Sequence, residues 1–192
     1  MKEDKLTNAI IERHKSKASK RENSDEKNTP DSISLEIRPE EHYNHYGTRG
    51  IVDLFIREKQ EYSGGREGVT DYIIEVKSEL RNANEVIRQA NKMHDYFYKG
   101  SDWAKPFRNY FSLYVELNPS NYSHIKENMH MYQSLSQKGI SIFFCDDEGL
   151  AARVFPTGDV TIFDFERWSE FHSKEEKIEK VRECVKGGSE EI

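Results

Sequence analysis

Two stretches of the chain decide the fold: residues 50–56, which read GIVDLFI, and residues 72–77, which read YIIEVK. Both are short apolar runs rich in β-branched and aromatic residues, so each predicts a buried strand. Side chains alternate across a strand, so Glu75 and Lys77 project from the face opposite to that of Val76. A carboxylate and an ammonium group therefore stand side by side at the end of an apolar strand.

Asp53 interrupts the first of these strands, and a buried aspartate is costly unless it is paired or binds a metal. If the two strands are neighbours, Asp53 and Glu75 converge, and a divalent cation relieves the repulsion between two close carboxylates. The candidate ligands are all oxygens, which favours Mg²⁺ over Zn²⁺. The alternative is that Asp53, Glu75 and Lys77 are strand-edge charges that pair with one another. The position of Asp53 inside an apolar run favours the metal site.

The rest of the sequence predicts an α/β fold, a mixed central sheet flanked by helices in the order α-β-β-β-α-β with a C-terminal α-β-β extension. We expect a single domain over residues 1–192, with a core of about 5–117, an extension of about 118–165 and a tail at 166–192 with a helical pattern. Outside the two strands, the pattern predicts helices at 4–20, 83–97 and 125–135, strands at 33–37, 110–117, 140–144, 151–155 and 160–165, and loops at 21–30 and 57–70.

Composition excludes several classes of protein. The chain has 192 residues and a formal net charge of −6, which argues against a polycation that coats DNA or an anionic membrane. No apolar run approaches the roughly 20 residues of a membrane helix, and the N-terminus leads into no signal-peptide core. The two cysteines form neither a disulfide framework nor a four-ligand zinc site, so we expect a reducing, cytoplasmic location without a membrane partner.

Residues 50–54 (GIVDL) and 73–77 (IIEVK), followed by a helix that carries Gln89, resemble the PD-(D/E)XK nuclease superfamily. This group includes restriction endonucleases, Holliday-junction resolvases and RecB-type nuclease domains. The resemblance implies a restriction-endonuclease-like core, a Mg²⁺ site in which Mn²⁺ substitutes, and cleavage of DNA. By position it implies that Asp53 and Glu75 bind the metal, with the backbone carbonyl of Val76 as a further ligand.

The same resemblance implies that Lys77 is the catalytic lysine and that Gln89 matches a glutamine found on the helix after the lysine strand in some members. Many members carry a further acidic ligand on the first helix. Glu12 is the candidate by position, and a solvated helix residue is the equal alternative for it. Glu36, Glu40 or Glu41 could serve instead. The glycine-rich stretch between Asp53 and Glu75 is unusually long for the family.

Four basic residues are candidates for contact with nucleic acid. Arg81, Arg88 and Lys92 recur at helical spacing on the polar face of the helix after the lysine strand, where phosphate contacts would hold a duplex. The alternative is an ordinary solvated helix face with intrahelical ion pairs. Arg49 is the better single candidate, because its strand carries it towards the acidic residues.

The sequence thus predicts a Mg²⁺-dependent DNA endonuclease of restriction, repair or recombination type, with duplex or branched DNA as its partner. Two alternatives stay open: a non-catalytic nuclease-fold module that binds nucleic acid, and an RNA-directed nuclease. Cutting both strands of a duplex usually needs two sites, so a homodimer is compatible with this function, although no signal in the sequence specifies one.

Overall fold

The computed structural model describes residues 2–24, 29–45, 48–98, 107–116, 122–145, 151–154 and 160–163. Its helices are α1 (Lys2–Glu22), α2 (Ala83–Tyr98), α3 (Tyr122–Glu127) and α4 (Met129–Gln137). Its strands are β1 (Ser32–His45), β2 (Thr48–Tyr62), β3 (Arg66–Lys77), β4 (Phe107–Glu116), β5 (Ser141–Cys145), β6 (Ala151–Val154) and β7 (Val160–Phe163).

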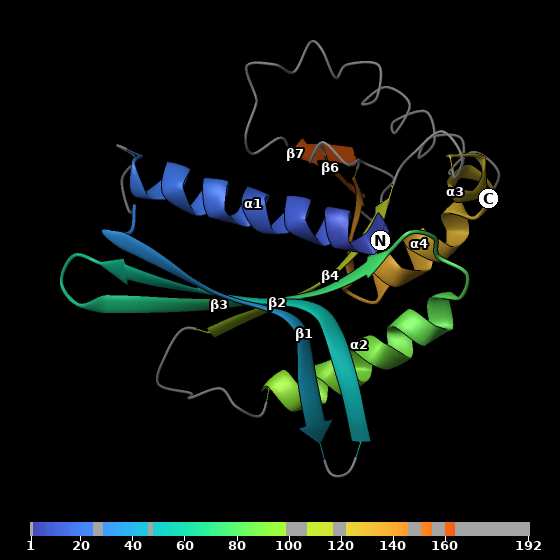
Figure 1. Ribbon diagram of the computed structural model, residues 1–192, viewed down its shortest axis with the longest axis horizontal. Helices are drawn as coiled ribbons and strands as arrows, with labels where there is room; N and C mark the ends of the chain where they lie inside the picture. The colour runs from blue at the N-terminus through green and yellow to red at the C-terminus, as the bar shows by residue number, and fades with distance from the viewer. Residues whose placement is uncertain are drawn as a thin grey trace.

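The strands form one mixed sheet in which they lie in the order of the sequence, from β1 to β7. The pairs β1–β2 and β2–β3 are antiparallel, β3–β4 and β4–β5 are parallel, and β5–β6 and β6–β7 are antiparallel. Helix α1 lies across one face of the sheet and α2 lies on the other (Figure 1). The predicted α/β class and the predicted order α-β-β-β-α-β are confirmed.

Alternation along β2 and β3 divides their side chains between the two faces of the sheet. On the α1 face, Leu6 and Ile10 of α1 pack against buried residues that include Ile74 and Val76. On the α2 face, Ile73 packs in a separate cluster with Met93 of α2. Because both faces are covered, these strands read as continuous apolar runs, and the charged residues within them stand out.

Residues 57–70 are not the loop that the glycines predict. Strand β2 continues to Tyr62 and β3 begins at Arg66, so this stretch is a long β-hairpin. Arg57 lies opposite Asp71 in the register and donates two hydrogen bonds of 2.8 Å to its fully buried carboxylate. The loop prediction was wrong because cross-strand ion pairs, rather than apolar alternation, stabilise these strands. The tight turn uses Gly64 and Gly65, which have φ angles of 86° and 75°.

The C-terminal extension is also more divided than predicted. The helix expected over 125–135 is broken at Asn128, where the backbone leaves the helical conformation between α3 and α4. Asn128 turns its side-chain amide back to the carbonyl of His124, at 2.9 Å, and competes with the regular helical pattern. Beyond this helix pair lie β5, β6 and β7, which match the strands predicted at 140–144, 151–155 and 160–165, although the α-β-β label counts only two of them. The predicted helical tail lies outside the described residues.

Within the described part of the chain, none of the helices has the length and apolar character needed to cross a membrane.

Candidate active site

Asp53 lies where β2 and β3 separate. Their ladder ends with Leu54 opposite Ile74, whereas β2 stays paired with β1 as far as Thr48. Just beyond the ladder, the Val76 N–H donates a hydrogen bond of 2.8 Å to Oδ2 of Asp53. The aspartate therefore replaces the strand partner that this peptide group lacks. With about a third of its side chain exposed, Asp53 still presents carboxylate oxygen to the outside.

Glu75 and Lys77 project from the same face of β3 as the sequence predicts, and they meet Asp53 there. Nζ of Lys77 lies 2.6 Å from Oε1 of Glu75 and 3.4 Å from Oδ2 of Asp53. The side chain of Glu75 is only 8% exposed, whereas that of Lys77 is 31% exposed. The three charged groups thus converge on one point at the edge of the core, with the lysine between the two carboxylates.

The electrostatics of this cluster oppose the ionisation of Glu75. Burial raises the pKa of Glu75, the charge of Asp53 raises it further, and the ammonium of Lys77 only partly offsets both effects. Burial alone would lower the pKa of Lys77, but attraction to Glu75 and Asp53 outweighs it and leaves that pKa above its usual value. Two carboxylates and one ammonium leave an excess of negative charge when all are ionised.

Gln89 of α2 reaches the same cluster from the helix side. It lines a cavity of about 20 Å³ together with Glu75, between α2 and the sheet. Oε1 of Gln89 and Oε2 of Glu75 are both buried, and neither has a hydrogen-bond partner within the described residues. When Glu75 is ionised, two buried acceptors cannot satisfy one another, so this cavity then calls for a donor or a cation. Gln89, which the resemblance places on the helix after the lysine strand, thus lines the same cavity as Glu75.

The oxygen donors of this site are chemically suited to a divalent cation. The unsatisfied oxygen of Glu75 and the half-exposed carboxylate of Asp53 are hard oxygen ligands, and Mg²⁺ commonly uses one or two protein carboxylates and completes its shell with water. The carbonyl of Val76, the third predicted ligand, belongs to the residue whose N–H binds Asp53. Within the described residues no cluster of three or more His, Cys, Asp or Glu side chains is close enough to hold a metal.

Three of the four candidates for a further acidic ligand, Glu12, Glu36 and Glu41, lie on the other face of the sheet or pair with other residues. Glu12 is exposed on α1 and pairs with Lys15 at 2.8 Å, and α1 packs on the face opposite to Glu75. Glu36 and Glu41 both pair with Arg38.

Glu40 is the fourth candidate, and its backbone is unusual. By the register of β1 and β2, Glu40 stands opposite Asp53, but these two residues do not form a ladder pair. Its φ of 53° is the only positive value among the described non-glycine residues. A glutamate in this region is uncommon and costs conformational energy. The exposed Glu40 therefore marks the bend at which the β1–β2 hairpin leaves the sheet.

Two residues near the site, Glu85 and Tyr43, were not among the predicted site residues. Glu85 of α2 raises the pKa of Glu75 through its charge. It stands one helical turn before Gln89, so the i, i+4 spacing is the signal that could have placed it. Tyr43 of β1 is buried and lies opposite Gly50. A Cβ on Gly50 would come within 2.6 Å of Cε1 of Tyr43 and closer still to Cζ and Oη.

The predicted basic residues occupy the surface around this cluster. Arg49 is exposed on the β1–β2 hairpin, and Arg81 is exposed just before α2 and pairs with Glu79 at 3.4 Å. Arg88 is exposed on α2, and its charge acts on Tyr43, as does that of Glu75. Lys92 is half-buried one turn further along α2. Arg88 is thus the basic residue with the most direct electrostatic link to the site.

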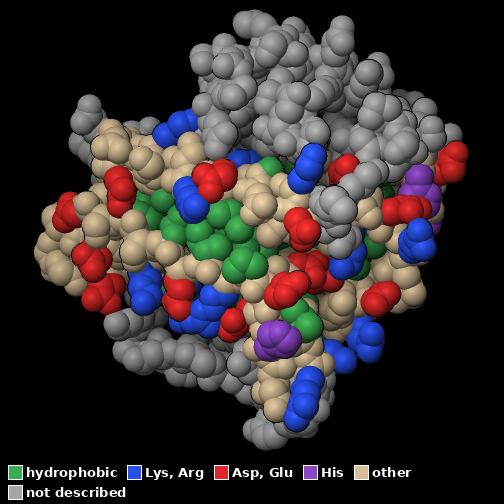
Figure 2. Space-filling view, in the orientation of Figure 1, with side chains coloured by type: hydrophobic (Ala, Val, Ile, Leu, Met, Phe, Trp, Pro, Cys, Tyr) green, Lys and Arg blue, Asp and Glu red, His purple; other side chains and the backbone are tan. Residues whose placement is uncertain are grey.

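The face seen in Figure 2 carries acidic and basic side chains interspersed rather than one continuous basic patch. Hydrophobic side chains gather there between α1 and the sheet. A surface of mixed sign gives little non-specific attraction to phosphates, so binding depends on a few placed cations.

Comparison with known families gives one match. The model of a PD-(D/E)XK nuclease superfamily domain matches residues 1–142, which include α1, the strands with Asp53, Glu75 and Lys77, and α2. Searches of curated proteins and of solved structures found no match.

Proposed function

Because the chain belongs to the PD-(D/E)XK nuclease superfamily, we propose that it is a divalent-metal-dependent nuclease that hydrolyses phosphodiester bonds of DNA. The observation that carries this proposal is the contact of Lys77 with both Asp53 and Glu75. A scaffold that only bound nucleic acid would not require Asp53 and Glu75 to lie close enough to repel one another. It would also not require a buried oxygen of Glu75 that has no hydrogen-bond partner among the described residues. Strained electrostatics of this kind are typical of functional sites.

Asp53 and Glu75 would hold the metal, together with the carbonyl of Val76, and we propose Mg²⁺ as the natural ion with Mn²⁺ as a substitute. When bound, such an ion lowers the pKa of a coordinated water and polarises a phosphoryl oxygen. Asp53 and Glu75 contribute the negative charge that retains the ion at the edge of the sheet. Gln89 would orient groups in the small cavity next to Glu75 through its amide.

Lys77 has a separate role in this proposal. Its raised pKa keeps the ammonium protonated at neutral pH, so it acts as a fixed positive charge rather than as a general base. Water adds to phosphorus and loses a proton to solvent, the bond from phosphorus to the leaving oxygen breaks, and that oxygen takes up a proton from solvent. The protonated lysine stabilises the negative charge that develops on the phosphoryl oxygens. Arg49, Arg81, Arg88 and Lys92 would position the backbone of the substrate through its phosphates.

The direct test is a panel of end-labelled substrates incubated with the purified chain in Mg²⁺, in Mn²⁺ and in EDTA. The panel contains single-stranded DNA, duplex DNA, a four-way DNA junction and single-stranded RNA. We expect cleavage of at least one DNA substrate with either metal and none in EDTA. Cleavage of RNA alone would replace DNA by RNA as the substrate. Failure to cleave any substrate would overturn the proposal.

A titration calorimetry experiment with Mn²⁺ separates the nuclease from a non-catalytic module that binds nucleic acid. The nuclease must bind the ion, and the Glu75→Gln variant must bind it more weakly by about tenfold or more, because a charged ligand is lost. Equal heats of Mn²⁺ binding for the original chain and for Glu75→Gln would show that the metal does not bind at Glu75.

The proposal extends to assembly and location. One chain offers one such cluster among its described residues, so cleavage of both strands of a duplex at one position would need a homodimer, which light scattering can detect. The chain has only two cysteines, too few for a disulfide framework, which supports the reducing, cytoplasmic compartment that we propose.

A further inference from the structure

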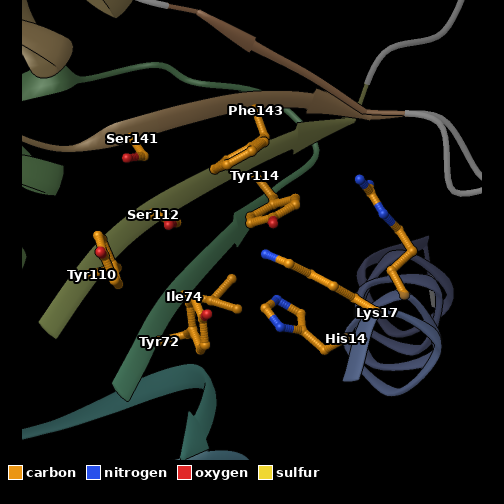
Figure 3. A pocket seen from close by; sticks show the side chains of 10 residues that line it. His14, Lys17, Tyr72, Ile74, Tyr110, Ser112, Tyr114, Ser141 and Phe143 are labelled. Carbon is orange, nitrogen blue, oxygen red and sulfur yellow. The ribbon is translucent and has the colours of Figure 1, made fainter. Parts of the chain in front are cut away.

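A second cavity lies on the other face of the sheet from Asp53, Glu75 and Lys77. It has a volume of about 260 Å³ and is enclosed by α1 on one side and by β3, β4 and β5 on the other. Figure 3 shows His14 and Lys17 of α1 directed towards the strand side chains of Ile74 and Tyr114. Its volume is just below the range of typical ligand sites, about 300–1,000 Å³.

The lining of this cavity is rich in cations and hydroxyl groups. Arg13 and Lys17 contribute two positive charges, and no described lining residue is acidic. Arg13 is only 3% exposed, which is rare for an arginine. Residues with hydroxyl groups, which are potential hydrogen-bond donors, also line it: Tyr72, Tyr110, Tyr114, Ser112 and Ser141.

Charges in this cavity have lost much of their hydration. Burial lowers the pKa of Lys17, Glu58 opposes that shift, and Arg21 and Arg13 add to it. Glu58 is itself engaged by Arg21 at 2.6 Å. Burial, assisted by Lys17 and Arg13, lowers the pKa of His14 to about 3, so its imidazole is neutral and can serve as a hydrogen-bonding group. An anion in the cavity would interact favourably with the positive charges of Lys17 and Arg13.

Aromatic rings form the remaining walls. Tyr72 and Tyr110 are stacked with their centroids 5.8 Å apart, and Tyr114 and Phe143 are stacked at 4.5 Å. His14 meets Tyr72 edge to face at 4.8 Å. Aromatic surfaces of this kind accept planar groups such as nucleobases.

We propose that this cavity is a second ligand site, which binds a small phosphorylated compound of the nucleoside monophosphate class. Arg13 and Lys17 hold the phosphate, the hydroxyl groups of the strands complete its hydrogen bonds, and the aromatic walls receive the planar part. The ligand is either a free nucleotide or the phosphorylated end of a nucleic-acid strand, which present the same chemistry. The site is separated from Asp53, Glu75 and Lys77 by the sheet, so it does not depend on the proposed nuclease activity.

Binding can be measured by calorimetry on the full chain in EDTA, which removes any contribution of a metal at the other site. The probes are inorganic phosphate, adenosine 5′-monophosphate, adenosine, and a short single-stranded oligonucleotide with and without a 5′-phosphate. The test variant is Lys17→Met. Its matched control is Lys15→Met, which makes the same charge change on the same helix at an exposed side chain.

We expect saturable binding of the monophosphate, at least tenfold weaker binding of adenosine, and a loss of about tenfold or more in Lys17→Met but not in Lys15→Met. The phosphorylated oligonucleotide competes if the ligand is a strand end and fails to compete if it is a free nucleotide. Lys77→Met should bind the monophosphate as the original chain does. Absence of saturable binding by every phosphorylated probe, or equal affinity of Lys17→Met and Lys15→Met, would overturn the proposal.

If Lys17→Met does not fold, Tyr110→Phe keeps the test decisive. Tyr110 is 41% exposed, so loss of its hydroxyl leaves the packing intact. We expect monophosphate binding several-fold weaker than in the original chain, and unchanged binding would contradict the site.

Discussion

Asp53 has two roles, one as a hydrogen-bond acceptor and one as a charged group, and substitutions can separate them. Its Oδ2 accepts the Val76 N–H where the ladder ends, and its charge serves the proposed metal site. Asp53→Asn keeps an acceptor but loses the charge, so we expect loss of metal-dependent cleavage with a Tm close to that of the original chain. Asp53→Ala leaves the Val76 N–H without its partner and should also lower the free energy of unfolding by about 1–3 kcal/mol.

Thermal unfolding of the two variants checks this separation. Equal destabilisation by Asp53→Asn and Asp53→Ala would show that the charge, rather than the hydrogen bond, stabilises the separation of β2 and β3.

Glu75 is expected to destabilise the fold in its ionised form. Its pKa is raised by burial and by Asp53, so the folded chain holds this proton more tightly than the unfolded chain. Stability is therefore lost as the pH rises from the usual glutamate pKa through the raised one. We predict that Glu75→Gln raises the free energy of unfolding at pH 7 by about 1 kcal/mol, while abolishing cleavage.

The pH dependence provides the control for this prediction. Below the usual glutamate pKa, Glu75 is protonated in both states, and the gain from Glu75→Gln should vanish. A gain that persists unchanged at acid pH in urea unfolding experiments would contradict the assigned cause.

Among the elements, the β1–β2 hairpin depends on one close cross-strand contact. The ring of Tyr43 covers Gly50, and any Cβ at that position overlaps it. Because Tyr43 is buried, its ring has little room to move, and we expect Gly50→Ala to cost about 1–3 kcal/mol of stability.

A double-mutant cycle isolates this contact. In a Tyr43→Ala background the cost of Gly50→Ala should largely disappear, as measured by urea unfolding of the four proteins. If the losses of unfolding free energy from Gly50→Ala and Tyr43→Ala are additive, Gly50 is needed for its backbone conformation and not for the space beneath the Tyr43 ring.

The elements also show what the sequence could and could not reveal. Glu75 and Lys77 were predictable because alternation along one strand fixes their common face. The hairpin at 57–70 was not, because its stability comes from pairs such as Arg57 with Asp71 that are distant in the sequence. The cavity under α1 could not be predicted either, since it forms only when Lys17 of the helix meets strands from three parts of the chain.

For the whole molecule, the net charge of −6 limits how it can approach nucleic acid. Few cations surround the site, so we expect weak binding of DNA with a shallow dependence on salt. The affinity should drop with a slope of about −0.9 per phosphate contact in a plot of log K against log salt concentration. Arg88→Gln should reduce that slope by about one in fluorescence anisotropy measurements with the uncleavable Asp53→Asn background. An unchanged slope for Arg88→Gln would show that Arg88 does not contact a phosphate.

The central claim is that Asp53, Glu75 and Lys77 form one metal-dependent hydrolytic centre. Single-turnover cleavage of the preferred substrate in Mg²⁺ tests it most directly, with Lys77→Met compared against Lys59→Met, an exposed lysine of β2 that lies outside the cluster. We predict that Lys77→Met lowers the rate by about 10²–10⁴-fold while Lys59→Met leaves it unchanged. A folded Lys77→Met protein that cleaves as fast as the original chain would contradict the account.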